Sequence, residues 1–377
     1  MCRMLRTMAI STNTPELHNP TRPLSAGRIP AKHGSFAALN NGRELTKMIS
    51  TKLVATFLFA YFAFFAANPL HAAAAPTTIR VGYPQLNGAV IPLWTIQAGK
   101  LDQPYGVDLN SIYIPGGARL TQTAVSGDID IALTGGAVIN AILSGAELVC
   151  VALQVPTYAF SLYGRTEFKE VADLRGKTLG VITKGAASDH ASIALLKQYK
   201  MTQKDMKVLY FSRQGDALAA LDKGIVNAAV LSAPTTLMAR RLGYKQIVNI
   251  GALKLPYTFI GAAVHRSLTK QNPELIKSFL KAFMAGLKVS KEQPAFAKQA
   301  SARHFGSTDA EIAEEAYNSF VPLFPQVPYV TEESVRGTLA ATNHPKAATA
   351  NPKDFFDNRF LQELESSGFV KELYASR

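Results

Sequence analysis

The chain has 377 residues, a formal charge of +13 and hydrophobic residues at 47% of its positions, a composition typical of a globular protein. Residues 1–75 hold eight of the 40 basic and two of the 27 acidic residues, so the formal charge of the remaining chain is only +7. The remaining basic residues are scattered singly, whereas a nucleic-acid-binding surface needs a clustered patch, and we therefore exclude nucleic acid as a partner.

The N-terminal region divides into two parts. Residues 1–47 are polar and carry no apolar periodicity, and we interpret them as a non-native or disordered extension. Residues 48–75 have the order of a secretory signal peptide: Lys52, then an apolar run over Leu53–Ala67, then Pro69 and a cluster of alanines. The run is shorter than the roughly 20 residues of a membrane span. An uncleaved N-terminal anchor is the alternative.

Two features of this region bear on export. A methionine opens the signal-like segment, so translation could start at Met1 or at Met48, and the cleavage site stays open. No cysteine follows the apolar run, so we expect no lipid anchor. The sequence thus predicts a protein secreted through a signal peptide and without a lipid anchor.

Cysteine and histidine usage argues against catalysis and metal binding. Cys2 precedes the signal-like segment, which leaves Cys150 without a partner for a disulfide or a Cys-rich metal site. The histidines are dispersed, and no nucleophile with a base or pair of carboxylates has a recognisable spacing. We expect no catalytic residues, no metal and no cofactor.

From residue 78 onward, short β-rich runs alternate with helical patterns, which is typical of α/β folds. The stretches 79–133 and 178–231 share one order of elements: strand, turn, helix, strand, helix ending at Gly, strand. We therefore predict two similar lobes, each a mostly parallel sheet flanked by helices. The expected strands are 79–83, 109–114, 129–133, 148–153, 178–182, 208–211, 228–231 and 258–264. The expected helices are 90–99, 118–126, 138–143, 188–199, 216–223, 235–242 and 274–291, followed by a mainly helical tail.

Several segments together carry a family resemblance. The chain from about residue 79 resembles the nitrate/sulfonate/taurine and thiamine-pyrimidine-precursor group of periplasmic substrate-binding proteins. The order of the matching segments agrees as well. These segments are Ile79–Tyr83, Ser126–Ala132 with Thr134, Gly135 and Gly136 after it, Val171–Gly180, Lys184–Asp189, Ala219–Pro234 and Asn272–Glu274.

The resemblance implies a type II Venus-flytrap fold in which the chain crosses twice between lobes. We expect lobe 1 over residues 76–165, lobe 2 over 166–254, and a return to lobe 1 with C-terminal helices over 255–377. It also implies a monomeric receptor that captures a small organic or inorganic solute and delivers it to an ABC permease in the inner membrane.

Ligands of open α/β sheets bind beyond the carboxyl ends of strands, so we expect the ligand-binding residues in the turns that follow them. The Gly-rich turn at 185–189 opens a helix and offers N–H donors to an anion, but Ser188 or Asp189 could instead cap that helix. The charge and identity of the ligand therefore stay open. Trp94 is expected in the core and His190 on a helix surface. The predicted ligand-binding residues are Tyr83, Asn87, Gly116, Gly117, Thr134, Gly135, Gly136, Gly185, Ala186, Ser188, Ser232 and Thr258.

Two other functions share some of these features. Pyrimidine synthases of thiamine biosynthesis have the same fold, but they carry a Cys-rich iron-binding motif that a chain with Cys150 alone does not match. A ligand sensor without a permease would look the same in sequence. A neighbouring permease gene would distinguish it from an importer component.

Overall fold

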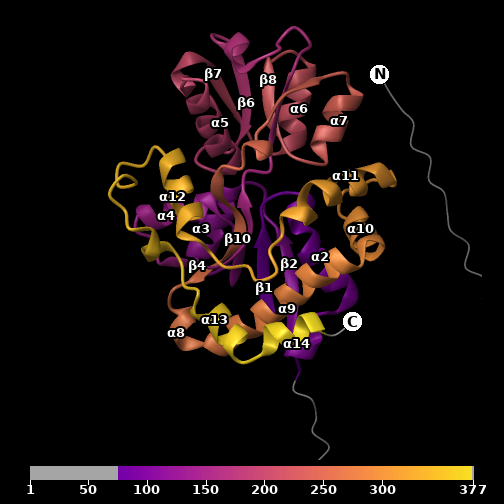
Figure 1. The fold of residues 1–377 in the computed structure, drawn as a ribbon, viewed down its shortest axis with the longest axis vertical. Helices are drawn as coiled ribbons and strands as arrows, with labels where there is room; N and C mark the ends of the chain where they lie inside the picture. Colours follow the sequence, from indigo (N-terminus) through magenta and orange to yellow (C-terminus); the bar gives the residue numbers. More distant parts are fainter. Residues whose placement is uncertain (1–74, 376–377) are drawn as a thin grey trace, which may run out of the picture. The chain divides into compact units, whose positions relative to one another are not determined.

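The computed structural model describes residues 75–375. The N-terminal extension and all but the last residue of the predicted signal peptide lie outside the described residues. Within 75–375, no helix is both long and apolar enough to cross a bilayer. The described chain forms two five-stranded sheets with helices around them, which confirms the predicted two-lobed α/β fold (Figure 1).

The first sheet has the strand order β2-β1-β3-β10-β4. β1 pairs in parallel with β2 and β3, whereas β10 is antiparallel to both β3 and β4, so four strands point the same way. Its strands are β1 (Thr77–Tyr83), β2 (Val107–Tyr113), β3 (Ile131–Thr134), β4 (Leu148–Thr157) and β10 (Pro256–His265).

The second sheet repeats this arrangement in the order β7-β6-β8-β5-β9. β6 pairs in parallel with β7 and β8, and β5 is antiparallel to β8 and β9. Each strand therefore has a counterpart at the same place in the first sheet, and for β6, β7 and β8 the repeated order of elements predicts this. The strands are β5 (Ser161–Gly164), β6 (Thr178–Ile182), β7 (Lys207–Phe211), β8 (Ala228–Leu231) and β9 (Lys245–Asn249).

Helices lie close to the predicted positions. The α-helices are α2 (Ile91–Gly99), α3 (Gly117–Val125), α4 (Gly136–Leu143), α5 (Ala187–Gln198), α6 (Gln214–Asp222), α7 (Thr235–Arg241), α8 (Leu268–Gln271), α9 (Pro273–Glu292), α10 (Pro294–Ala302), α11 (Ala310–Phe320), α12 (Glu332–Ala341), α13 (Arg359–Ser366) and α14 (Phe369–Ala375). The 3-10 turns are η1 (Gly88–Val90), η2 (Gln103–Tyr105), η3 (Val171–Leu174), η4 (Gln203–Asp205), η5 (Gly251–Leu253), η6 (Val321–Leu323) and η7 (Pro352–Phe355).

The chain passes between the sheets twice, after β4 and after β9. β5, at residues 161–164, belongs to the second sheet, so the first crossing lies at residues 158–160 and the lobe boundary expected at 165/166 is placed too late. The second crossing covers residues 250–255. Lobe 2 is therefore one continuous stretch of chain inserted into lobe 1.

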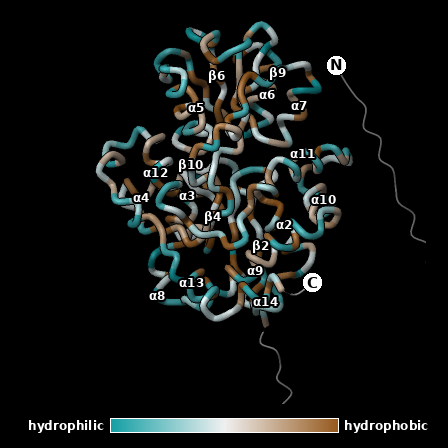
Figure 2. The backbone as a smooth tube through the Cα atoms, viewed as in Figure 1, coloured by the Kyte–Doolittle hydropathy of each residue, from teal (hydrophilic) through white to brown (hydrophobic). Residues whose placement is uncertain are grey.

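Apolar residues concentrate along the strands and the helix faces that cover them (Figure 2). Trp94 is 1% exposed and stacks on His304 with ring centroids 4.5 Å apart, which confirms its expected place in the core. Gly286 lets α9 approach α2, because a Cβ at this position would lie 2.5 Å from the Ile96 side chain. Burial raises the pKa of the free thiol of Cys150 to about 12.

Candidate functional site

A cavity of about 400 Å³ lies where the carboxyl ends of the parallel strands of both sheets converge. In the first lobe, residues after β1 and β2 and Thr134 at the end of β3 reach it. In the second lobe, residues after β6, β7 and β8 do so. Because strand ends are where open α/β sheets hold ligands, this cavity is the candidate binding site.

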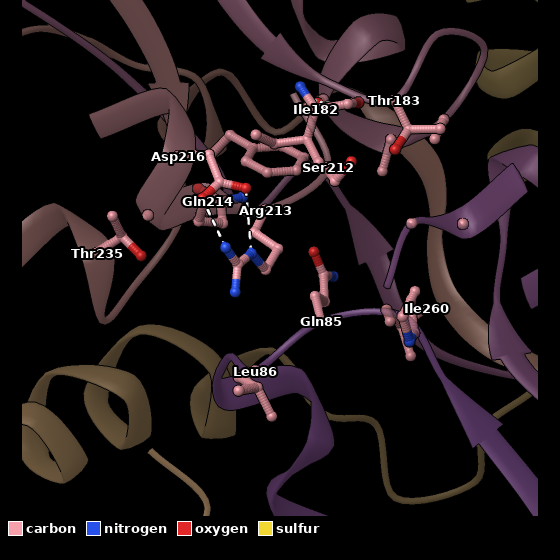
Figure 3. Close-up of a pocket in the computed structure, with 18 of the residues that line it drawn as sticks. Gln85, Leu86, Ile182, Thr183, Ser212, Arg213, Gln214, Asp216, Thr235 and Ile260 are labelled. Carbon is pink, nitrogen blue, oxygen red and sulfur yellow. Dashed lines mark hydrogen bonds and ion pairs between the residues drawn. The ribbon is translucent and has the colours of Figure 1, made fainter. Parts of the chain in front are cut away.

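Lobe 1 contributes uncharged groups to the cavity. Gln85 and Leu86 come from the loop after β1, and both are labelled on the same side of the cavity in Figure 3. Tyr113, the last residue of β2, also lines it. Gly116 has φ +89°, and a Cβ there would lie 2.9 Å from the Thr183 hydroxyl of lobe 2, so a larger residue would disturb the contact between the lobes.

Lobe 2 contributes the charges. Arg213 and Asp216 lie at the start of α6, directly after β7. Arg213 donates from Nε to Asp216 Oδ2 at 3.1 Å and from Nη2 to Oδ1 at 2.9 Å, and Figure 3 shows this pair at the cavity. Burial raises the pKa of the Tyr113 hydroxyl, while Arg213 lowers it and Asp216 raises it. The tyrosine thus lies within electrostatic reach of both charges.

The rest of the wall is largely apolar and comes from many elements. Phe160 lies on the first crossing and Phe259 on β10, with ring centroids 5.1 Å apart. Met238 of α7 and Ile312 of α11 line the cavity from the two lobes. This lining suits a ligand with an apolar body.

Five of the predicted ligand-binding residues line this cavity, namely Gly116, Gly117, Thr134, Ala186 and Ser188. The Ser188 hydroxyl is already engaged, because it accepts from the backbone N–H of Ile182 at 2.7 Å and donates to the carbonyl of the same residue at 2.8 Å. Its role in the structure is therefore to hold the start of α5 against the end of β6.

The other predicted residues do not line the cavity. They contact other residues of the protein instead. Tyr83 is 5% exposed and contacts Trp94 edge-to-face. Thr258 donates its backbone N–H to the hydroxyl of Thr338 at 3.0 Å and is 1% exposed. The remaining five are Asn87, Gly135, Gly136, Gly185 and Ser232.

Asn87 and Ser232 meet across the two lobes. The Asn87 amide donates to the Ser232 hydroxyl at 3.3 Å, and Asn87 also accepts from the N–H of Ala89 at the start of η1. Both residues are 1% exposed. Both were predicted to bind the ligand, but in this structure their side chains bond to each other.

The glycines of the two Gly-rich turns lie close to neighbouring groups of the protein. A Cβ on Gly135 would lie 1.9 Å from the Thr258 carbonyl, and one on Gly136 would lie 1.9 Å from the Tyr257 hydroxyl. The N–H of Gly185 donates to the carboxylate of Asp189 at 2.8 Å. Asp189 thus occupies a donor that an anionic ligand would need, which is the capping alternative considered from the sequence.

A second cluster joins α4 and α5 and is called here the buried junction, comprising Asn140, Gly185, His190, Tyr257 and Thr342. Asn140 Nδ2 lies 2.7 Å from the Gly185 carbonyl and 3.2 Å from His190 Nε2, and its Oδ1 accepts from the Thr342 hydroxyl. His190 Nδ1 lies 3.0 Å from the Tyr257 hydroxyl.

His190 is 1% exposed, so the expectation of a helix-surface histidine is wrong. Burial lowers its pKa to about 4. Because Asn140 Nδ2 can only donate, His190 Nε2 accepts and Nδ1 carries the proton, which is the neutral ring. The sequence pattern of α5 did not indicate that His190 is buried, because the residues that cover its side chain come from α4, β10 and α12.

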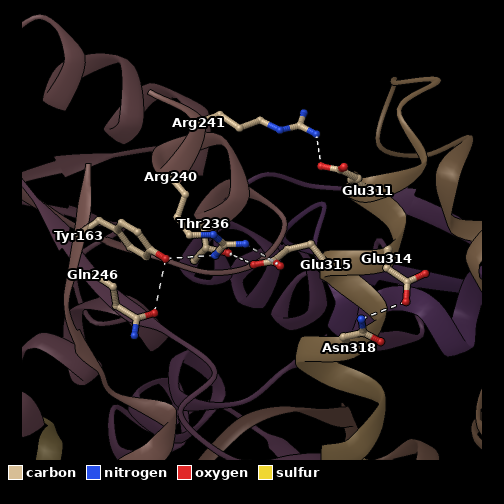
Figure 4. Close-up of polar contacts among 9 residues, drawn as sticks. All are labelled: Tyr163, Thr236, Arg240, Arg241, Gln246, Glu311, Glu314, Glu315 and Asn318. Carbon is tan, nitrogen blue, oxygen red and sulfur yellow. Dashed lines mark hydrogen bonds and ion pairs between the residues drawn. The ribbon is translucent and has the colours of Figure 1, made fainter. Parts of the chain in front are cut away.

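A different set of contacts joins α7 to α11 and is called here the charged junction (Figure 4). Arg240 donates to Glu315 at 2.8 Å, and the Thr236 hydroxyl donates to the same carboxylate at 2.8 Å. Arg241 forms ion pairs with Asp309 and Glu311. These residues come from lobe 2 and from the C-terminal helices, which contact lobe 1 through α2 and η1.

The segment Ser212–Asp216, which joins β7 to α6 and supplies both charges of the cavity, was not among the predicted residues. A signal was present, because the segment follows β7 as the predicted Gly116 and Gly117 follow β2 in the other half of the repeat. The equivalence of the two lobes therefore predicts ligand-binding residues after β7 as well as after β2, and Arg213 is one of the residues after β7. Among residues 75–375, no group of three or more His, Cys, Asp or Glu side chains could hold a metal ion.

Comparison with known proteins agrees with this geometry. Residues 103–297 match the family model described as NMT1/THI5 like. A protein of Brachyspira hyodysenteriae, named as an ABC transporter periplasmic binding protein, is 23% identical over 277 residues, which cover 69% of this chain and 78% of that protein.

Solved structures share the fold. The alkanesulfonate-binding protein SsuA from Xanthomonas axonopodis pv. citri, bound to MOPS, has a TM-score of 0.61 and 20% identity, covering 71% of this chain and 91% of that one. The periplasmic nitrate-binding protein NrtA from Synechocystis PCC 6803 also has a TM-score of 0.61, with 13% identity and coverage of 78% and 89%.

Proposed function

The chain belongs to the NMT1/THI5-like family, and from this premise we propose that it is the periplasmic solute-binding component of an ABC-type importer. Its relative in Brachyspira hyodysenteriae carries such a name. The protein acts as a monomer without catalysis or a cofactor. It reaches the periplasm through the signal peptide at residues 48–75, without a lipid anchor, and delivers its solute to a permease in the inner membrane.

The observation that carries this proposal is the cavity at the strand ends. Both lobes line it, so a bound solute contacts both and stabilises the arrangement in which they face each other. A permease then recognises this liganded form. The solute shifts the population of the two states only through contacts that the open state lacks.

The lining favours an organic solute over a bare inorganic anion. Phe160, Phe259, Met238 and Ile312 present apolar surface that nitrate would leave uncovered. Of the two structural neighbours described above, the alkanesulfonate-binding protein is thus the better guide to the ligand. The ligand we propose has an apolar body and one polar end.

A thermal-shift screen of the chain from residue 75 tests the proposal, using small sulfonates, carboxylates, nitrate and pyrimidines. A ligand present at 100 times its Kd stabilises the folded state by about 2.7 kcal/mol, which raises Tm measurably. Hits are then measured by calorimetry, and the product of each incubation is analysed. Binding without conversion of the solute supports a receptor, whereas turnover, or silence across a panel extended to further metabolites, contradicts it.

A matched pair of variants locates the binding. Leu86→Trp places an indole in the cavity and abolishes binding of the hit. Leu253→Trp is the control, since Leu253 is 38% exposed against 39% for Leu86 and does not line the cavity. Equal loss in both variants would place the site elsewhere.

A further inference from the structure

The cavity is lined by one acidic and one basic side chain among the described residues, Asp216 and Arg213. Their two hydrogen bonds use the Nε and Nη2 atoms of the guanidinium. Nη1 is therefore left with two N–H groups for a ligand. In Figure 3 the guanidinium points into the cavity, toward the side occupied by Gln85 and Leu86.

We infer that Asp216 determines the charge of the ligand, by restricting Arg213 to a group with a single negative charge. The inference rests on the proposed function and concerns the same cavity. A carboxylate held 2.9 Å from the guanidinium already neutralises its charge, so an incoming anion meets a pair with no net charge.

A singly charged group still gains from this pair. It accepts from the free N–H groups of Arg213, and such charge-assisted bonds are directional as well as strong. A doubly charged group gains the same bonds, but its second charge is repelled by Asp216 and meets no other cation, because lobe 1 lines the cavity with neutral groups such as Tyr113 and Gln85.

Local structure keeps Asp216 in this role. Arg213 is the N-cap residue of α6 in an extended conformation, and Asp216 lies in the first turn, where a carboxylate also interacts favourably with the helix dipole. The N–H of Asp216 donates to the Arg213 carbonyl at 3.2 Å. The carboxylate thus lies beside the guanidinium without a ligand, although the two side chains are 38% and 63% exposed.

Two probes with the same butyl chain test the inference. At about pH 8, 1-butanesulfonate carries one charge, whereas butyl phosphate carries two, because the second pKa of a phosphate monoester is about 6. Calorimetric affinities are measured for both probes on each variant. We expect the wild-type protein to prefer the sulfonate by about tenfold or more.

Asp216→Asn removes the repulsion and should bring the preference close to one, chiefly by improving the affinity for butyl phosphate. Asp222→Asn is the matched control, since Asp222 lies on the same helix and bonds the hydroxyl of Tyr244 outside the cavity. Arg213→Gln should weaken both probes by about tenfold. Thermal unfolding of each variant confirms that it is folded.

The outcomes separate this inference from the proposed function. An unchanged preference in Asp216→Asn, with sulfonate binding intact, overturns the role of Asp216 and leaves the receptor standing. If neither probe binds any variant while another solute of the panel binds, the inference that Arg213 binds an anionic group of the ligand is wrong. Only a panel without any ligand counts against the receptor itself.

Discussion

Two of the junctions between the lobes have opposite character. The buried junction holds a neutral histidine and an amide whose oxygen and nitrogen all have partners. The charged junction joins α7 and α11 through ion pairs whose arginines have side chains 43–44% exposed. One junction depends on a partly buried network of hydrogen bonds around the buried His190, and the other on charges that salt can screen.

This difference indicates which junction separates first when the two lobes move apart. Exposed ion pairs each contribute about 1 kcal/mol or less, so the charged junction separates at little cost. Opening the buried junction would break several hydrogen bonds, each contributing about 0.5–1.5 kcal/mol, and would expose the buried rings of His190 and Tyr257 to water. We therefore expect α7 and α11 to move apart first, while α4, α5 and α12 stay together and act as the pivot.

Removing the amide at the buried junction should have the largest effect. Asn140→Ala leaves the Gly185 carbonyl, His190 Nε2 and the Thr342 hydroxyl without their partner, and we expect a loss of about 3 kcal/mol in the free energy of unfolding. Urea titration measures it. Asn318→Ala is the control, because Asn318 is exposed and bonds Glu314 on its own helix; it should change stability by less than about 0.5 kcal/mol. Equal effects would contradict the comparison.

The second-largest effect should be a loss of stability on acidification, caused by protonation of His190. Its pKa is about 4 in the folded protein against 6.5 for an ordinary histidine, so the unfolded chain binds the extra proton first as pH falls. Stability from this group is full above pH 6.5 and is lost toward pH 4, with about 2 kcal/mol gone by about pH 5. Denaturant titrations across this range on wild type and His190→Gln measure it. A slope that is the same in both proteins would show that His190 is not the group responsible.

Breaking the charged junction should have the smallest effect on stability. Arg240→Gln removes the bonds to Glu315 and Tyr163, at a cost of about 1 kcal/mol that should largely vanish in about 1 M salt, where the screening length is about 3 Å. The control is Arg175→Gln, whose partner Asp205 lies in the same lobe. Spin-label distances between α7 and α11 should lengthen in Arg240→Gln and stay unchanged in the control. No lengthening would place the pivot elsewhere.

Much of the fold could be predicted because each parallel strand of the repeat is an apolar run followed by a turn and a helix. β6 and β8 begin and end at the predicted residues. β5 and β9 were missed, since they lie outside the repeated order of strand, turn and helix, and β9 (Lys245–Asn249) carries only two apolar residues. Their place in the sheet depends on pairing with β8 and with each other, which are long-range contacts.

The site was harder to predict, because a strand-end rule gives the region but not the direction of each side chain. The rule led to Gly116, Gly117 and Thr134, which line the cavity. It could not show that Asn87 bonds to Ser232, a residue 145 positions away, or that Asn140 reaches the Gly185 carbonyl. Such pairings depend on how the lobes meet, and no local pattern encodes them.

The inserted position of lobe 2 has a consequence for synthesis. All strands of the second sheet lie within residues 161–249, so this sheet is complete as soon as that stretch has left the ribosome. In the first sheet β4 pairs along its length with β10, which is made about a hundred residues later. Until β10 arrives, β3 and β4 each present an unpaired edge to other chains, and such edges favour aggregation of an incompletely folded protein.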